Sequence, residues 1–122
     1  MTWRIVLVAC VLAMVPVAVA HAQSVTATWT WTQGSGGPAQ GFDVERKAES
    51  CTLAALSFAK IASTAANVLT YVDTALTRGT TYCYRVDAFN TAGKSPYSTT
   101  AEIAVPLLVP AAPSPPQLLL GP

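Results

Sequence analysis

The sequence predicts an all-β fold, an antiparallel sandwich of two sheets, on three observations. Apolar and polar residues alternate over several short segments, which is the period of a half-buried strand. Turn sequences rich in Gly, Asn and Ser recur about every 8 to 12 residues. Helical periodicity is absent, although the Ala and Leu content of residues 52–59 could support one helical turn.

The first clear strand covers residues 24–32, SVTATWTWT. Val25, Ala27, Trp29 and Trp31 share one face, and Ser or Thr occupies the other. This shared parity favours core positions for both Trp side chains over an exposed platform for stacking on sugars. The Gly-rich segment that follows predicts a loop.

Alternation resumes at residues 42–47, with Phe42 and Val44 facing inward and Asp43 and Glu45 facing outward. Two neighbouring carboxylates also occur in glycosidases. Because this face also carries Lys and adjoins Arg, we expect the pair to be fully solvated surface charges. Three further strands are expected at residues 58–61, 68–72 and 98–105.

The best-patterned strand lies at residues 82–88, where one parity faces inward and the other outward. A hairpin turn is expected directly after it at residues 90–93, with Gly93 suited to a positive φ. The inward residues are Tyr82, Tyr84, Val86 and Ala88, and the outward residues are Cys83, Arg85 and Asp87.

The N-terminal residues have the pattern of a cleaved export signal. A short basic start precedes a nearly unbroken apolar run, and the small-x-small pattern Ala20-His21-Ala22 follows it. The run is shorter than the roughly 20 residues of a spanning helix. We therefore expect residues 1–22 to be a signal peptide, and the protein to be secreted or periplasmic with no membrane attachment after cleavage. An uncleaved anchor and lipidation at Cys10, in the lipobox-like sequence LVAC, are the alternatives.

Charge and motifs exclude several classes of function. Of seven Lys and Arg, Arg4 lies in the leader, so six remain against six Asp and Glu, and the balance speaks against nucleic acid as a partner. The chain has no G-x-S-x-G motif and no phosphate-binding loop. The sequence therefore predicts a non-enzymatic protein without a cofactor.

Two cysteines, Cys51 and Cys83, remain after the leader. In an oxidising compartment an even number favours a single disulfide. Two free thiols or a metal pair are the alternatives, but a metal site needs three or four ligands and no His follows His21.

From residue 24 to residue 105 the chain resembles the fibronectin type III family, within the immunoglobulin-like sandwiches, and especially its bacterial secreted form. Each motif alone is weak, but their order and spacing together are specific. The resemblance rests on Trp31, on Phe42 and Val44 in GFDVERK, on Leu76-x5-Tyr82, on Tyr84-Arg85-Val86-x-Ala88, and on Asn90-x-x-Gly93-x-Ser95.

The resemblance implies roles for two tyrosines and both cysteines. Tyr82 would be the corner tyrosine, with its ring in the core and its hydroxyl donating a hydrogen bond to a backbone acceptor near residues 76–79. Tyr84, Leu76 and Trp31 would be structural core positions. The family's third and sixth strands are neighbours, which brings the loop holding Cys51 close to Cys83 and implies the disulfide between them.

The chain departs from the family at its beginning. Cleavage after Ala22 leaves only two residues ahead of Val25, so we expect the first strand to be missing and one sheet edge to be open. A tolerated six-strand sandwich, an edge filled by the tail, and a partner strand added in trans are the three interpretations. The Pro-rich residues 107–122 predict a disordered tail after a domain at residues 23–106.

These expectations combine into a non-enzymatic, exported and monomeric interaction or spacer module. The resemblance implies binding of protein or polysaccharide without specifying which. One alternative is a structural subunit whose open sheet edge is completed by a partner strand. The other is a carbohydrate-binding accessory domain.

Overall fold

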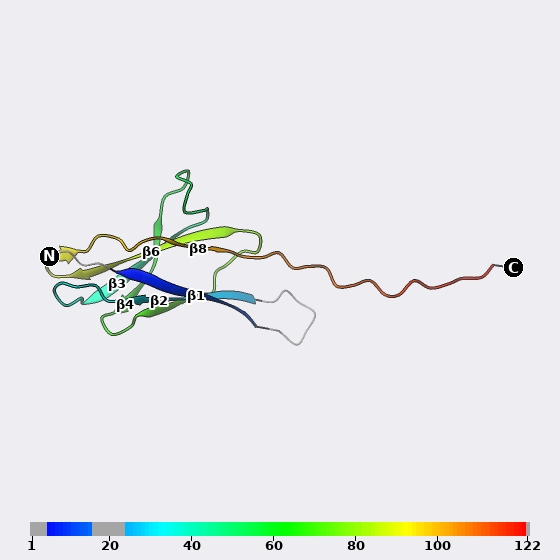
Figure 1. Cartoon of the computed structure of the whole chain (residues 1–122), viewed down its shortest axis with the longest axis horizontal. Coiled ribbons are helices and arrows are strands. Elements are labelled where there is room, and N and C mark those ends of the chain that lie inside the picture. Colours follow the sequence, from blue (N-terminus) through cyan, green and yellow to red (C-terminus); the bar gives the residue numbers. More distant parts are fainter. Residues whose placement is uncertain (1–4, 16–23, 122) are drawn as a thin grey trace.

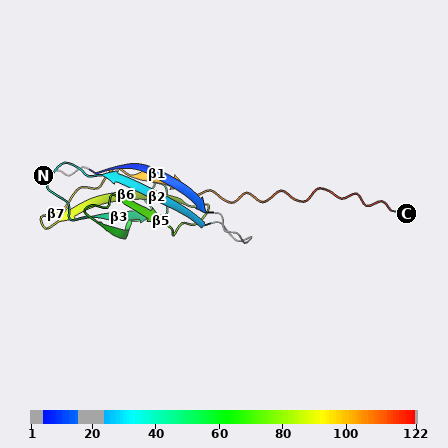
Figure 2. The ribbon, with the colours of Figure 1, turned by 90° about the horizontal axis from the view of Figure 1, so that it is seen from below.

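The computed structural model describes residues 5–15 and 24–121, and it confirms the predicted two-sheet antiparallel sandwich (Figure 1). One sheet has the order β1-β2-β5, formed by β1 (Val6–Val15), β2 (Ser24–Thr32) and β5 (Thr70–Asp73). The other contains β4 (Ala59–Ala65), β3 (Gly41–Lys47), β6 (Thr81–Asn90) and β7 (Gly93–Lys94), and β8 (Ala101–Ala104) also pairs with β6. The view in Figure 2 shows β1 and β2 as a layer over β3 and β6.

The strands follow the predicted pattern, with shifted ends where pairing decides their length. β2 covers the predicted residues, and β3 begins one residue earlier than predicted. β4 extends to Ala65, and β8 is limited to four residues. Residues 52–58 form turns and irregular backbone, Ala59 begins β4, and no helix occurs in the described part of the chain. None of the described residues therefore forms a helix that could span a membrane.

The core lies between the two sheets and is built around aromatic side chains. Trp29 and Trp31 of β2 are 2% and 3% exposed, which confirms their predicted core positions. The Trp29 ring packs on Tyr84 of β6 at 4.5 Å between centroids, and Trp31 packs edge-on against Phe42 of β3 at 5.7 Å. Inward residues of β6 complete this layer, since Tyr82, Tyr84, Val86 and Ala88 are all buried.

The expected gap at the first strand is occupied in the structure. β1 pairs antiparallel with β2 from Val6↔Thr32 to Val15↔Ser24, with a register shift between Leu7 and Ala9. Its residues belong to the predicted leader, whose cleavage pattern at residues 20–22 lies outside the described residues. The residues predicted to be removed on export are therefore those that supply the first strand here.

The tail runs away from the sandwich as an extended, exposed segment (Figure 1). Its described residues form no strand, and the edge beside β2 is occupied by β1. Proline explains why the tail forms no strand, because Pro106, Pro110, Pro113, Pro115 and Pro116 lack the backbone N–H that a sheet ladder needs.

Candidate interaction surface

The described residues contain no group of three or more His, Cys, Asp or Glu that could hold a metal ion. The candidate site lies on the surface of the β3-β6 sheet and its loops. Four buried or partly buried structural residues were predicted from the sequence, and all four pack in or against the core. They are Trp31 on β2, Leu76 before β6, and Tyr82 and Tyr84 on β6.

The corner before β6 is held by Tyr82. The Tyr82 hydroxyl accepts a hydrogen bond from the Thr77 backbone N–H at 2.9 Å, within the segment expected for this contact. We expected the backbone to provide an acceptor here, and that detail is wrong, because the backbone group is a donor. Arg46 lies over the same ring, with its guanidinium carbon 4.8 Å from the ring centroid.

A buried carboxylate at the end of β5 joins the two sheets, and sequence reasoning missed it. Asp73 accepts hydrogen bonds from the Tyr84 hydroxyl and from Arg46, each at 2.7 Å, and from the Ala75 N–H at 3.0 Å. Burial, together with this bond to Asp73, raises the pKa of Tyr84. Only the inward parity of Arg46, which needs an acid partner, could have indicated the network.

The prediction that Asp43 and Glu45 are fully solvated is wrong. Asp43 is 3% exposed and is bonded to Ser63 at 2.5 Å and to Lys94 at 2.9 Å. Burial by itself would raise the pKa of Asp43, but these hydrogen bonds outweigh it, so the pKa lies below its ordinary value. Glu45 accepts two hydrogen bonds from Arg85, at 2.9 and 2.7 Å, which makes it a structural partner of that cation.

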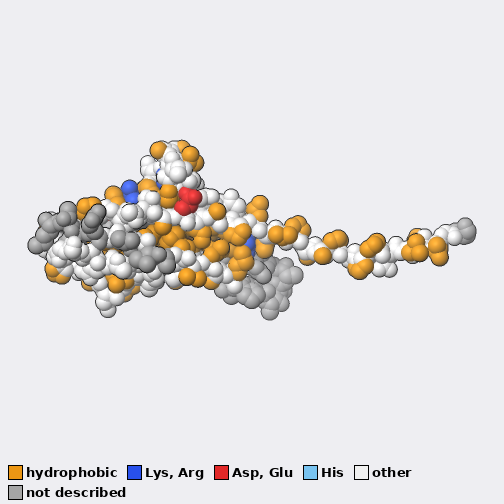
Figure 3. Space-filling view, in the orientation of Figure 1, with side chains coloured by type: hydrophobic (Ala, Val, Ile, Leu, Met, Phe, Trp, Pro, Cys, Tyr) orange, Lys and Arg blue, Asp and Glu red, His pale blue; other side chains and the backbone are white. Residues whose placement is uncertain are grey.

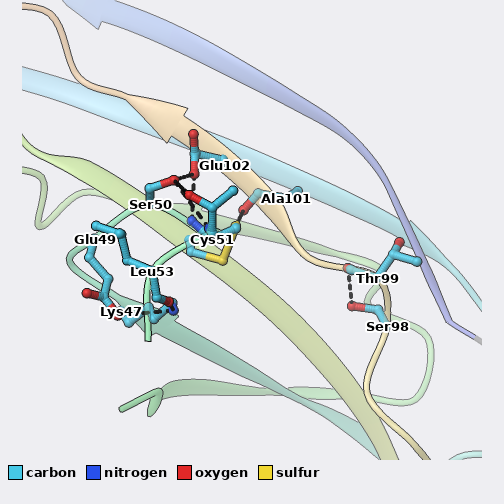
Figure 4. The surroundings of a disulfide bond; sticks show 11 residues. Lys47, Glu49, Ser50, Cys51, Leu53, Ser98, Thr99, Ala101 and Glu102 are labelled. Carbon is cyan, nitrogen blue, oxygen red and sulfur yellow. Dashed lines mark hydrogen bonds and ion pairs between the residues drawn. A yellow bond between two sulfur atoms is a disulfide. The ribbon is translucent and has the colours of Figure 1, made fainter. Parts of the chain in front are cut away.

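The predicted disulfide joins Cys51 in the β3–β4 loop to Cys83 on β6 (Figure 4). Cys83 faces outward from the sheet, as expected, but it is fully buried because the loop covers it. Residues 48–58, which we call the braced loop, are thereby fixed against the outer face of the β3-β6 sheet. In Figure 1 this loop projects from the body of the sandwich beside β6.

Polar contacts hold the braced loop on both sides of the disulfide (Figure 4). On one side, the Lys47 ammonium bonds Glu49 at 3.1 Å and also the Leu53 carbonyl, while Glu49 accepts the Leu56 N–H at 2.8 Å. On the other side, Glu102 of β8 accepts the Ser50 hydroxyl and the Cys51 N–H, each at 2.6 Å. The loop is therefore ordered by contacts that come from three strands.

The two acids that accept hydrogen bonds from the braced loop, one in the loop and one on β8, are held in their ionised form. Hydrogen bonding from the Leu56 N–H, and then from Lys47, lowers the pKa of Glu49. The Ser50 hydroxyl, followed by the Cys51 N–H, lowers the pKa of Glu102. Each carboxylate is thus stabilised as an acceptor for backbone that would otherwise be unpaired.

The tip of the braced loop is apolar and faces solvent. Leu53 and Leu56 are 55% and 51% exposed, and Ala54 and Ala55 between them are also exposed. Figure 3 shows hydrophobic side chains on the lobe that projects from the sandwich. A loop that is rigid and still presents Leu side chains to water is unusual for a purely structural connection, because apolar side chains gain free energy when they are buried.

An arginine stack lies beside the braced loop on the outer face of the β3-β6 sheet. The Arg85 guanidinium carbon is 4.0 Å from the ring centroid of Phe58 and 3.6 Å from that of Tyr97. Glu45 fixes the guanidinium from the side, and a hydrogen bond with Glu45 raises the pKa of the half-exposed Tyr97. The loop tip and this stack together form what we call the outer patch.

The fold and the intact corner define an antiparallel β-sandwich of two sheets. A model of the fibronectin type III domain matches residues 15–104. The chain therefore belongs to the fibronectin type III domain family. A search of curated proteins finds no match.

Solved structures support the same fold. An Fn3-like protein from Clostridium thermocellum is 26% identical with a TM-score of 0.52, over 80% of this chain and 91% of that one. A human fibronectin type III domain reaches a TM-score of 0.60 at 18% identity, over 89% of this chain and 82% of that one. The twitchin kinase region from C. elegans is 18% identical with a TM-score of 0.55, over 66% of this chain but only 14% of its own.

Proposed function

We propose that this chain is an exported, monomeric fibronectin type III module of the bacterial secreted kind, which binds a partner protein through the outer patch. The observation that carries the proposal is the pairing of rigidity with apolar exposure. A disulfide and buried ion contacts fix a loop whose tip presents Leu53 and Leu56 to solvent. Preorganisation of this kind lowers the entropy lost on binding.

The chemistry of the outer patch favours protein over polysaccharide. Arg and Tyr are among the residues that dominate protein interfaces, and Arg85 and Tyr97 lie beside the exposed leucines. Sugar stacking needs open aromatic faces. Both Trp side chains of β2 are buried, and Arg85 covers a face of Tyr97.

Export agrees with the redox chemistry of the fold. The disulfide between Cys51 and Cys83 needs an oxidising compartment to persist. Together with membership of the fibronectin type III family, this bond supports an extracellular location for the protein. The predicted leader at residues 1–22 would supply the route. We further propose that the module is non-enzymatic, since its ionisable side chains serve as hydrogen-bond and ion-pair partners within the fold.

The proposal is tested by site-specific photo-crosslinking in cells that export the protein. A photoreactive residue replaces Leu56 in one variant and Val72 in another. Val72 is a matched control because it is 47% exposed but lies on β5, in the opposite sheet. We expect a discrete adduct with one protein from position 56 and none from position 72.

Serine substitutions then measure the contribution of the loop tip. Leu53→Ser combined with Leu56→Ser should reduce capture of that protein about tenfold or more, as for central interface residues, while Val72→Ser leaves it unchanged. Equal adducts from both positions would contradict the proposal. So would an adduct only with a second copy of this chain, or retention on insoluble polysaccharide that the serine variant loses.

A further inference from the structure

We propose that the exported chain, once its leader is removed, accepts one extended segment of a partner protein as a new strand beside β2. The occupant is a peptide that runs antiparallel to β2 and carries aliphatic side chains at alternating positions. It would fill the sites that Leu7, Cys10 and Leu12 hold in the structure. This inference rests on the leader removal contained in the proposed function, but it uses a different surface.

β1 shows which side chains the vacant position would take. Leu7, Cys10 and Leu12 pack against the core and lie opposite Trp31, Trp29 and Ala27 of β2. The intervening residues Val11 and Ala13 are exposed and lie opposite Thr28 and Thr26. The partner strand therefore needs apolar residues at alternate positions only, and its outward residues can be polar.

The backbone of β2 presents a defined set of hydrogen-bonding groups on the side where β1 lies. The Trp31 N–H donates to the Leu69 carbonyl at 3.1 Å, on the β5 side. Because backbone groups alternate along a strand, the N–H and C=O groups of Thr28 and Thr30 point toward β1. Without β1 these groups form an open edge, which is a template for strand addition.

The chain's own tail cannot supply this strand. Between its prolines the longest uninterrupted run is residues 117–121, whereas β1 pairs over almost its whole length of 10 residues. Each proline would remove a donor from the ladder.

A second copy of the mature chain is also a poor occupant. Its open edge is its own β2, and the inward side chains of that strand already pack on the second sheet, since Trp29 contacts Tyr84 and Trp31 contacts Phe42. A strand in the position of β1 must bring an uncovered apolar face. A flexible segment of another protein meets this requirement, and a folded copy does not.

The test uses the protein purified from the exported fraction, with its N-terminus sequenced. The probe is a labelled peptide of residues 5–15 that carries Cys10→Val to remove the thiol and Val11→Lys and Ala13→Lys for solubility. We expect one-to-one binding by fluorescence anisotropy and a higher unfolding midpoint with peptide present.

Backbone methylation provides a matched control. Val11 pairs with Thr28, so its N–H faces the ladder, while the N–H of Leu12 points away from β2. N-methylation at position 11 should weaken binding at least about tenfold, because a ladder hydrogen bond is lost and the methyl group obstructs the edge. The same modification at position 12 should leave binding unchanged.

Several outcomes would overturn the inference. Residues 5–15 retained in the exported protein, no binding of the peptide, or equal loss from both methylated peptides would each refute it. A dimer of the mature chain that the peptide does not dissociate would assign the edge to a second copy. If the exported chain is unfolded alone, circular dichroism is measured with and without the peptide. Folding of the chain on peptide addition supports the inference, and continued disorder refutes it.

The two proposals fail independently. The variant with Leu53→Ser and Leu56→Ser should bind the peptide as the natural chain does, because the braced loop lies on the other sheet. Retention of the leader would end the strand-acceptor inference and leave the outer patch available. Absence of an adduct at position 56 would end the outer-patch proposal and leave the strand-acceptor inference standing.

Discussion

Asp87 is a carboxylate buried on the outer face of β6, opposite Asp43 of β3. It is 1% exposed, its Oδ1 atom has no hydrogen-bond partner, and Lys94 approaches its other oxygen at 3.8 Å. Burial raises its pKa, Lys94 partly opposes this, and the neighbouring Asp43 adds to it. Ionised Asp87 therefore costs stability near neutral pH.

Asp87→Asn is expected to raise the free energy of unfolding at pH 7. The pKa of Asp87 is higher in the folded chain than its ordinary value of 3.8, so the penalty is fully present above the folded pKa. It is relieved as the pH falls through that pKa toward 3.8. Urea unfolding across a pH series should show the gain from Asn shrinking on acidification.

Asp43→Asn is the opposing control, because the pKa of Asp43 is lowered. Its carboxylate contributes stability that is present above 3.8 and lost as the pH falls through the folded pKa. The substitution should therefore destabilise the chain at pH 7. A pH-independent effect of Asp87→Asn, or destabilisation at pH 7, would show that the buried charge is compensated.

Tyr82→Phe is expected to destabilise the fold by about 1 to 2 kcal/mol, because the Thr77 N–H loses its acceptor in a partly buried corner. The unfolding midpoint in urea measures this. Tyr71→Phe is the control, since the partly buried Tyr71 also loses a hydroxyl but has no hydrogen bond to this corner. Equal unfolding midpoints for the natural chain and the Tyr82 variant would show that the corner contact does not stabilise the fold.

At the scale of elements, the braced loop combines a covalent closure with ion contacts. The disulfide joins residues separated by 32 positions, and it connects the β3–β4 loop to the centre of the second sheet. Its effect on the unfolded chain is entropic in the simplest model. Lys47, Glu49 and Glu102 then order the loop within the closed ring.

Replacing both Cys51 and Cys83 by Ala is expected to cost about 3 to 4 kcal/mol, because the closed loop no longer restricts the unfolded chain. Chemical unfolding of the natural and double-Ala chains measures it. A thiol reductant should lower the midpoint of the natural chain and leave the double-Ala chain unchanged. A reductant effect on both chains would point to a source other than this bond.

At the scale of the whole molecule, the two-sheet sandwich is followed by a tail, residues 107–121, that is almost entirely exposed. Leu118, Leu119 and Leu120 are almost fully exposed, and residues 107–121 form no strand or helix. Leu107 is the exception, since its side chain lies beside Gly79. Stability should therefore depend on the chain up to about this point.

Truncation after Val109 is expected to change the free energy of unfolding by less than about 0.5 kcal/mol, because the removed residues bury almost no surface. Thermal unfolding of the truncated and full chains measures this. Truncation after Val105 also removes Leu107 and serves as the comparison. A large loss from the first truncation would reveal a contact of the distal tail with the sandwich.

The side chains that face the core were predictable from local alternation along each strand. Val25, Ala27, Trp29 and Trp31 of β2 lie inward as their parity indicated, and so do the tyrosines of β6. The pairing of Cys51 with Cys83 followed from the family resemblance, because the neighbouring third and sixth strands bring the two cysteines together. The roles of Asp73 and Glu102 were not predictable, since Arg46 and Ser50 lie 27 and 52 positions away from them. The burial of Asp87 was not predictable either, since it depends on Asp43 of β3 opposite it.

The sequence by itself determined the fold class and the inward faces of the strands, because alternation and turn chemistry act between near neighbours along the chain. The disulfide pair followed only from what the family resemblance implied. The tertiary structure decided what covers each face. It buried the outward Asp43 and Cys83 beneath distant residues, and it placed the leader residues of β1 beside β2. The physical reason is that parity specifies the direction of a side chain, whereas burial depends on which segment packs over it.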